Sequence, residues 1–196
     1  MKWKAVVVLA GLLALPQVGS AQFISLRFVG LDMLGGAVVP GAGTDVGVTF
    51  GARFGFGDLF GGFARLGVEV DWWTARHDDP AYEIRNILGG IAIWKEIVGS
   101  GPVVPYLGMG GAIHSLDTAP VGRLTDPLPA EARRIAGARL GGSGFGGVAF
   151  ALSRTRAMWI LLEYRYTAVT DIPFQEIRLG FRLAGRRPVR SVASFP

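Results

Sequence analysis

Apolar and polar side chains alternate with a period of two along most of this chain. From residue 46 to residue 55 the even-numbered positions are apolar, and the odd-numbered ones carry glycine, threonine or arginine. The same alternation recurs over residues 63–72, 158–167 and 176–183. Successive side chains of a β-strand point to opposite faces, so each segment has one apolar face and one mainly polar or small face. The pattern predicts an all-β fold.

Eight strands account for the alternating segments, and no segment after the first 22 residues shows a helical period. We expect them at about residues 23–30, 45–56, 60–73, 84–96, 102–115, 137–152, 156–168 and 174–184. Short connections lie at 57–59, 97–101 and 153–155, and mostly longer ones at 31–44, 74–83, 116–136 and 169–173. Alternating short and long connections are typical of outer-membrane barrels, whose turns are short on the periplasmic side. The sequence therefore predicts an eight-stranded antiparallel up-and-down transmembrane β-barrel with both termini in the periplasm.

The N-terminal segment has the features of a secretory signal peptide. Lys2 and Lys4 precede an apolar run over residues 5–15, and small residues follow at 19–21. The run is shorter than the roughly 20 residues of a membrane-spanning helix, which favours cleavage after Ala21. We expect a signal peptide at 1–21, a barrel domain at 22–184 and a short basic tail at 185–196.

The alternation alone does not decide whether the apolar faces meet lipid or form the core of a soluble, lipocalin-like barrel. Several expected strands run about 12 residues or more, whereas soluble strands peak near 5–6. Glycines lie beside the charges on the polar faces, which suits a narrow lumen. Aromatic residues lie towards the strand ends, where a membrane girdle belongs. We assign to that girdle Trp72, Trp94, Tyr106, Trp159, Tyr164, Tyr166 and Phe181.

The polar faces carry charges of both signs, which the membrane interpretation places inside the barrel. The predicted lumen charges are Arg53, Arg65, Glu69, Asp71, Glu163, Arg165, Glu176, Arg178 and Arg182. Buried charges must be paired to offset a desolvation cost of several kcal/mol per ion. An eight-stranded barrel is just wide enough for side chains to fill. We therefore expect a salt-bridge network that plugs the lumen, with a narrow ion path along the same charges as the alternative.

Three stretches resemble the small outer-membrane β-barrel family that includes the OmpA transmembrane domain and OmpX. They are residues 105–111 (PYLGMGG), 162–166 (LEYRY) and 177–183 (IRLGFRL). The resemblance covers residues 22–184 and implies insertion by the barrel-assembly machinery, which reads a last strand that usually ends in an aromatic residue. The chain departs from that pattern, because its last strand ends near Leu183, with Phe181 two positions earlier.

No motif predicts catalysis, and we assign no catalytic residue, metal ligand or cofactor. The G-x-G-x-x-G at 142–147 lies inside a strand, where the nucleotide-binding turn cannot form. His114 and Ser115 are adjacent in a strand and face opposite ways, which disfavours a lipid-modifying site built on both. His77, Asp78 and Asp79 lack the spacing of a Ca²⁺ loop. The chain has no cysteine, which excludes disulfides and thiolate metal sites.

We expect an exported outer-membrane protein with a structural or interaction role, whose outer loops contact lipopolysaccharide or an external partner. The formal charge is +5, which is compatible with anionic lipid, while export argues against nucleic acid. A small porin-like channel is the alternative. A lipid-modifying enzyme and a soluble barrel are further alternatives.

Overall fold

The computed structural model describes residues 24–41, 43–78, 81–97, 101–121, 128–152 and 155–185. The expected signal peptide and the tail after Gly185 lie outside them. The strands are β1 (Ile24–Pro40), β2 (Gly47–Leu59), β3 (Ala64–Asp78), β4 (Ala81–Glu96), β5 (Val103–Pro120), β6 (Gly137–Ala151), β7 (Met158–Val169) and β8 (Phe174–Ala184). Two short helical segments are η1 (Phe60–Gly62) and α2 (Ala130–Ile135). The six-residue α2 was not predicted from the sequence.

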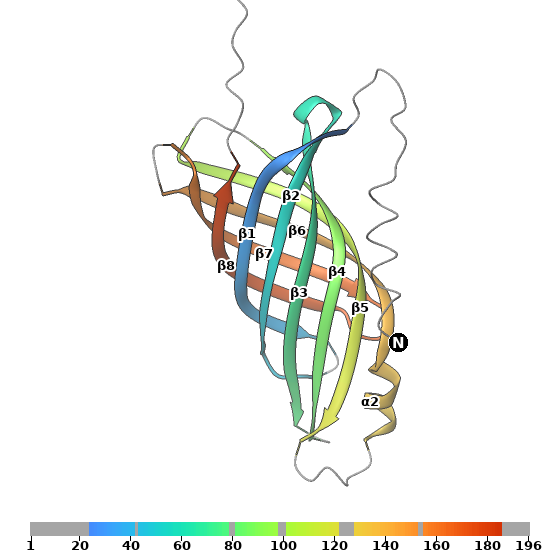
Figure 1. Ribbon diagram of the computed structural model, residues 1–196. Helices are drawn as coiled ribbons and strands as arrows, with labels where there is room; N and C mark the ends of the chain where they lie inside the picture. Colours follow the sequence, from blue (N-terminus) through green and yellow to red (C-terminus); the bar gives the residue numbers. More distant parts are fainter. Residues whose placement is uncertain are drawn as a thin grey trace, which may run out of the picture.

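The sheet is a closed barrel of eight strands (Figure 1). Each strand pairs antiparallel with the next along the chain, and β1 pairs with both β2 and β8. Closure removes the exposed strand edges that an open sheet would present. The predicted fold class, an eight-stranded antiparallel up-and-down barrel, is confirmed.

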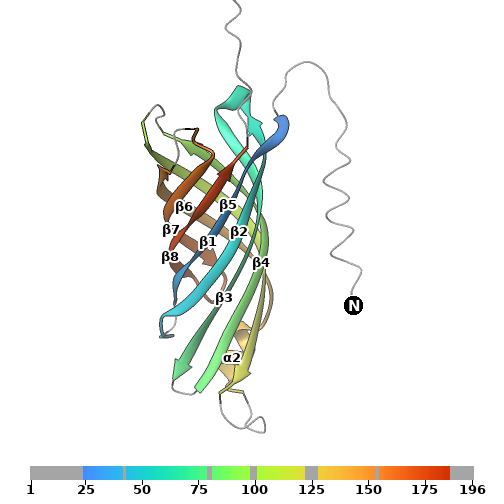
Figure 2. The ribbon, with the colours of Figure 1, turned by 60° about the vertical axis from the view of Figure 1, so that its left-hand side comes forward.

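The two ends of the barrel differ. β1 begins and β8 ends at the end that also carries η1, which we call the proximal end (Figure 1). At the opposite, distal end, β3, β4 and β5 extend furthest and α2 lies beside β5 (Figure 2). Within the part of the chain described, no helix is both long and apolar enough to cross a membrane.

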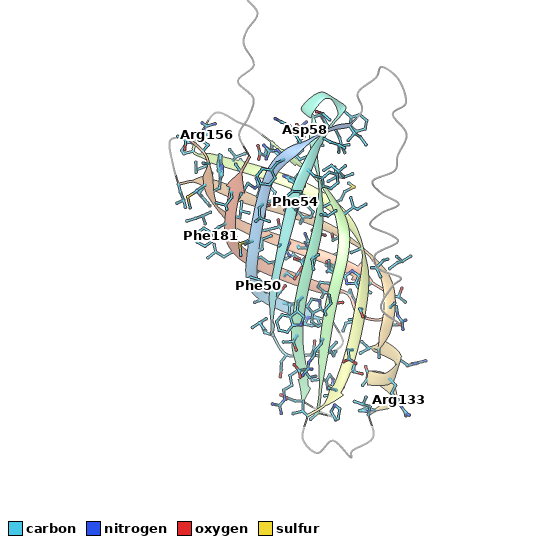
Figure 3. All side chains as sticks on the ribbon, in the orientation of Figure 1. Phe50, Phe54, Asp58, Arg133, Arg156 and Phe181 are labelled. Atoms are coloured by element: carbon cyan, nitrogen blue, oxygen red, sulfur yellow. The ribbon has the colours of Figure 1, made fainter. Side chains whose placement is uncertain are left out.

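Large apolar side chains cover the outside of the barrel. Phe50, Phe54 and Phe181 are exposed on it (Figure 3), as are Val70 and Leu179. The charged alternates on the same strands point inward and are buried. A soluble barrel has the opposite arrangement, with its apolar face inside, whereas a transmembrane barrel is apolar outside and polar inside. The predicted orientation of the faces is therefore confirmed.

The predicted alternation of short and long connections is wrong. The strands of the distal half are longer than expected: β3 runs to Asp78, β4 begins at Ala81 and β5 runs to Pro120. Only the connection between β5 and β6, residues 121–136, is long. Backbone pairing continues from Arg65↔Trp94 to Asp78↔Ala81, and this satisfies peptide groups that a loop would leave to water.

β1 is also longer than expected, and it exceeds its expected length by more than any other strand. Residues 31–40, which lie in the expected connection 31–44, belong to β1. Gly36 pairs with Thr49 on one side and with Arg178 on the other. The register of β1 against β2 shifts between Leu26 and Gly30, a bulge that obscures the alternation near the strand start.

A charge placed halfway along the outer face should destabilise the barrel in lipid. Leu179 lies near the middle of β8 and is exposed on the outside, so Leu179→Arg should cost about 2–4 kcal/mol of unfolding free energy. The measurement is urea-induced unfolding of the protein in lipid vesicles. Gln175→Arg on the same face, near the distal end of β8, is the matched control and should cost about 0–1 kcal/mol. Equal costs would contradict the membrane position of this face.

Candidate functional site

The interior of the barrel holds the charged residues. Nine of them are almost fully buried: Asp32, Arg53, Glu69, Asp71, Glu163, Arg165, Glu176, Arg178 and Arg182. They come from β1, β2, β3, β7 and β8. Among the described residues, β4, β5 and β6 contribute no charged side chain to this buried set. One wall of the lumen is therefore charged, and the opposite wall is uncharged in this buried set, with Asn86 and His114 among its buried polar residues.

Glu163 is the centre of the network. Its carboxylate accepts hydrogen bonds from Arg53 Nη2 at 2.9 and 3.0 Å and from Tyr106 OH at 3.1 Å. Arg178 Nη2 also donates to it, and Arg165 Nε lies 3.6 Å from its Oε1. Three guanidinium groups thus surround one carboxylate, and each needs further negative charge nearby to offset its burial.

Glu69 and Asp71 supply part of that charge. Arg165 donates to both oxygens of Glu69, at 2.9 and 2.6 Å, and to Asp71 Oδ2 at 3.1 Å. Arg178 Nη1 lies 3.0 Å from the same Asp71 oxygen. The planar guanidinium fork matches two carboxylate oxygens at once, which makes such pairs both strong and directional.

A second group of ion pairs lies towards the proximal end. Arg182 donates to both oxygens of Asp32, at 2.6 and 2.9 Å, and to Glu96 at 3.1 Å. Arg65 Nη2 donates to Glu96 at 2.8 Å. Arg53 Nη1 lies 3.5 Å from Asp32 and connects this group to the one around Glu163.

Glu176 is buried beside the network but is held differently. Its Oε1 accepts a hydrogen bond from Thr49 Oγ1 at 2.6 Å. No arginine or lysine among the described residues lies within 4.0 Å of its carboxylate as an ion pair, and its Oε2 has no hydrogen-bond partner there. The predicted charges therefore share one lumen, but Glu176 lies outside the ion-pair network and Arg65 lies at its less buried margin.

Apolar layers lie on both sides of the ion pairs around Glu163, whereas Arg182 lies level with the proximal layer, because it is the strand partner of Trp159. Along β7 the inward residues run from Trp159 and Leu161 through Glu163 and Arg165 to Thr167 and Val169. The proximal layer is the cluster Leu34, Ala92, Trp94, Val104, Tyr106, Phe145, Ala149, Trp159 and Leu161. The distal layer is the cluster Val38, Trp73, Ala75, Tyr82, Ile84, Leu88, Leu116, Ala132, Ile135, Val169, Ile172 and Phe174. The lumen is packed with side chains at both levels.

The short helix α2 belongs to the distal layer. Its inward residues Ala132 and Ile135 are buried against that cluster. Thr118 Oγ1 on β5 donates to the carbonyl of Ala132 at 3.2 Å, which ties α2 to the end of the barrel. The helix thus covers part of the distal opening.

Three predicted girdle residues are misassigned. Trp94, Tyr106 and Trp159 point into the lumen and are 3%, 1% and 7% exposed. Trp159 has the same parity along β7 as Glu163, so alternation alone already placed it inward. These rings fill the proximal lumen and contact the arginines: the guanidinium of Arg182 lies 5.6 Å from the Tyr106 ring. The other four, Trp72, Tyr164, Tyr166 and Phe181, are exposed on the outer face.

Asp32 and Glu96 were not predicted as lumen charges. Asp32 fell in an expected loop, and Glu96 was the last residue of an expected strand. Asp32 is two positions from the buried Gly30 and from the buried Leu34. One signal in the sequence could have revealed Asp32. The predicted inward arginines outnumber the predicted inward carboxylates, and buried arginines need carboxylate partners.

The residues tested for catalysis are held apart. His114 is buried inside the barrel with its Nδ1 3.2 Å from Asn86 Nδ2, while Ser115 faces the outside. His77 stacks on Tyr82 with ring centroids 4.7 Å apart, and Asp78 pairs with Arg76. Asp79 lies outside the described residues. In the described segments, no three or more His, Asp or Glu side chains are grouped so that they could hold a metal ion.

Comparison with solved structures gives the class of the fold. Neisserial surface protein A matches at a TM-score of 0.57, with 17% identity over 83% of this chain and 99% of that one. The chain folds as a small outer-membrane β-barrel. OprG from Pseudomonas aeruginosa matches at 0.51, with 10% identity over 82% of this chain and 99% of that one. The outer-membrane enzyme PagL also matches at 0.51, with 11% identity over 79% and 99%.

No protein-family model and no curated protein sequence matches the chain. The solved structures share its fold at very low identity, and one of them is an enzyme while others are described only as outer-membrane or surface proteins. The likeness therefore establishes the architecture. The role of this barrel has to be argued from its own side chains.

Removing the central carboxylate should destabilise the barrel strongly. Glu163→Gln leaves Arg53 and Arg178 without their shared partner, and breaking a buried ion pair in this way costs about 3–5 kcal/mol. Urea-induced unfolding in lipid vesicles measures the change. Glu83→Gln is the matched control, since Glu83 pairs with the exposed Arg85 at the distal end; it should cost at most about 1 kcal/mol. A Glu163 variant as stable as the control would contradict a structural role for the network.

Proposed function

We propose that the protein resides in a bacterial outer membrane as a non-conducting barrel with a structural or interaction role. The observation that carries the proposal is the filled lumen: the ion pairs around Glu163 lie between two apolar layers. Buried ion pairs of this geometry hold strands together, whereas a pore needs a continuous hydrated path. The apolar outer surface supports the location in lipid.

The proposal places the proximal end of the barrel in the periplasm and the distal end outside the cell. The distal end carries charged side chains of both signs on the extended strands and on α2. Arg76, Asp78 and Arg85 are exposed there, and so is Arg133 (Figure 3). Arginine binds phosphate oxygens through paired N–H groups. This end is the part of the barrel that we propose contacts lipopolysaccharide or an external partner.

A catalytic role is not part of this proposal. His114 is enclosed by the lumen and Ser115 faces lipid, so the two side chains cannot act as base and nucleophile on one substrate, which would require hydrogen-bond reach. Insertion by the barrel-assembly machinery is proposed on the strength of β8, whose outward Phe181 supplies an aromatic side chain near the strand end.

Fractionation combined with a heat-modifiability gel tests the location. The protein should be recovered with outer membranes, and boiled and unboiled samples should migrate differently in detergent because the closed barrel resists unfolding by detergent alone. Recovery in the soluble periplasm without a mobility shift would contradict the proposed location. The same gel reports whether each variant described above is folded.

Planar-bilayer recording tests the filled lumen. Purified protein should insert without steady single-channel currents, because packed side chains fill the lumen at both apolar layers. A general porin recorded under the same conditions shows that the bilayer can report channels. Steady, protein-dependent current steps would favour the porin-like alternative and overturn the plugged lumen.

A further inference from the structure

The outer face of β4 carries an apolar band with a cation at each end. Arg85 lies towards the distal end of this face and Lys95 towards the proximal end, and both are exposed. The outward positions between them hold Ile87, Gly89, Ile91 and Ile93. The separation of ten residues corresponds to about 33 Å of strand, and to about 25 Å along the membrane normal for a strand tilted by about 40°. A lipid-facing band has this height, so the proposed orientation places Lys95 at the periplasmic boundary of the lipid.

Lys95 lies against an aromatic ring of the β2–β3 hairpin. Its Nζ is 3.4 Å from the centroid of the Phe63 ring, a cation–π contact that holds the ammonium at the outer surface. Leu107, the strand partner of Lys95 on β5, is also exposed on the outer face. The alkyl stem of a lysine covers apolar surface while its charge stays in a polar layer. The two apolar neighbours therefore favour a position of Lys95 at the boundary between lipid and water.

The tip of the β2–β3 hairpin extends the apolar outer face to its proximal edge. Phe60 of η1 and Phe63, which directly follows η1, are 63% and 60% exposed. η1 lies beside the start of β1 (Figure 2). Phe28 of β1 and Phe54 of β2 are also exposed, and their ring centroids are 5.4 Å apart. Exposed apolar patches of this kind mark contact with a membrane or a partner.

Lys95 has no ion-pair partner among the described residues. No carboxylate of the described segments lies within 4.0 Å of its ammonium, and the adjacent Glu96 faces the lumen, where it pairs with two arginines. The acidic residues outside the described segments are Asp79 and Asp126. They follow β3 and β5, which both end at the distal end of the barrel. Unlike the lumen arginines, Lys95 therefore has its charge available to a ligand outside the protein.

A phospholipid has the chemistry that this surface accepts. Its phosphate lies at the boundary between lipid and water, at the level of the ammonium, and its acyl chains can cover the apolar side chains beside it. Lysine binds phosphate as a point charge, and a basic residue near a membrane surface favours anionic headgroups. A protein partner in the periplasm is a poorer fit, because Lys95 and Leu107 occupy outward positions on the side of the barrel.

We infer that Lys95 and the Phe63 ring bind the phosphate of an anionic phospholipid of the phosphatidylglycerol type in the periplasmic leaflet. The inference rests on the proposed outer-membrane location and adds to it a lipid ligand of defined chemistry. Binding at this point also fixes the depth of the barrel, because the ammonium has to stay at the level of the headgroups. The site lies outside the lumen, so its test is independent of the conductance measurement.

Lys95 is the only lysine after position 4, so its ammonium can be observed directly by NMR. Protein purified from outer membranes is dimethylated with isotope-labelled formaldehyde in maltoside detergent, which keeps the positive charge. The resonance that is missing from Lys95→Arg belongs to Lys95. Phosphatidylglycerol should shift this resonance saturably, whereas inorganic phosphate and a neutral monoacylglycerol should not, because each offers only part of the ligand. No saturable shift with phosphatidylglycerol, or an equal shift with either partial ligand, would overturn the proposal.

Phe63→Leu removes the ring while keeping an apolar side chain. Losing the cation–π contact should weaken phosphatidylglycerol binding roughly two- to fivefold in the same titration. Phe54→Leu is the matched control, because Phe54 is an exposed aromatic residue that contacts Phe28 rather than a lysine; it should leave binding unchanged. Equal weakening by both variants would show general apolar contact and contradict a site at Phe63.

A second measurement isolates the charge. Urea-induced unfolding is compared in phosphatidylcholine vesicles with and without phosphatidylglycerol. The anionic lipid should raise the urea midpoint of the wild type and of Lys95→Arg, which keeps the cation, and should raise that of Lys95→Gln less. An equal increase for Lys95→Gln would refute the site. If Lys95→Gln fails the gel assay for folding, the Phe63→Leu titration decides. A failed lipid test with protein that is recovered in outer membranes would refute the site and leave the proposed location intact.

Discussion

The rest of this structure depends on the pairing of charges inside a lumen too narrow to hydrate them. Five carboxylates and four arginines are almost fully buried within the barrel, and single charges left there would cost several kcal/mol each. The bidentate pairs of Arg165 with Glu69 and of Arg182 with Asp32 resolve this cost through directional contacts. With all but one of these charges paired inside, the outer face is free to be apolar, which a lipid environment requires.

Glycine makes this packing possible in a narrow barrel. A side chain at Gly108 would meet the ring of Phe145 at 2.3 Å, and one at Gly51 would meet Asp71 Oδ1 at 1.5 Å. The Phe145 ring in turn lies 4.3 Å from the guanidinium of Arg53. The small residues are therefore placed where large inward side chains from a neighbouring strand need room. Large rings can be buried in this narrow lumen because glycines on the neighbouring strands leave room for them.

Period-two alternation predicted the strands and the inside-out arrangement because both follow from local geometry. It also placed Arg53, Glu69 and Glu163 inside, since parity is preserved along a regular strand. Asp32 was missed because a bulge and two glycines mask the period of β1. Trp94 and Tyr106 were assigned by residue type to the membrane interface, although packing inside the lumen decides their place. The sequence does not show that Arg65 and Arg182 share Glu96, because residues from three different strands meet there only in the folded barrel.

The ion pairs join the two ends of the chain. Asp32 and Arg182 are 150 positions apart, and Arg53 and Glu163 are 110 apart. The buried charges of β1–β3 are one arginine and four carboxylates, whereas those of β7 and β8 are three arginines and two carboxylates. The first and last strands therefore attract each other by opposite net charge. β4, β5 and β6 bury no charge among the residues described, so the buried arginines of β7 and β8 find most of their carboxylate partners only when the first and last strands meet. The barrel therefore closes and pairs its interior charges in the same step. A chain that ended before β8 would keep an open, charged cleft.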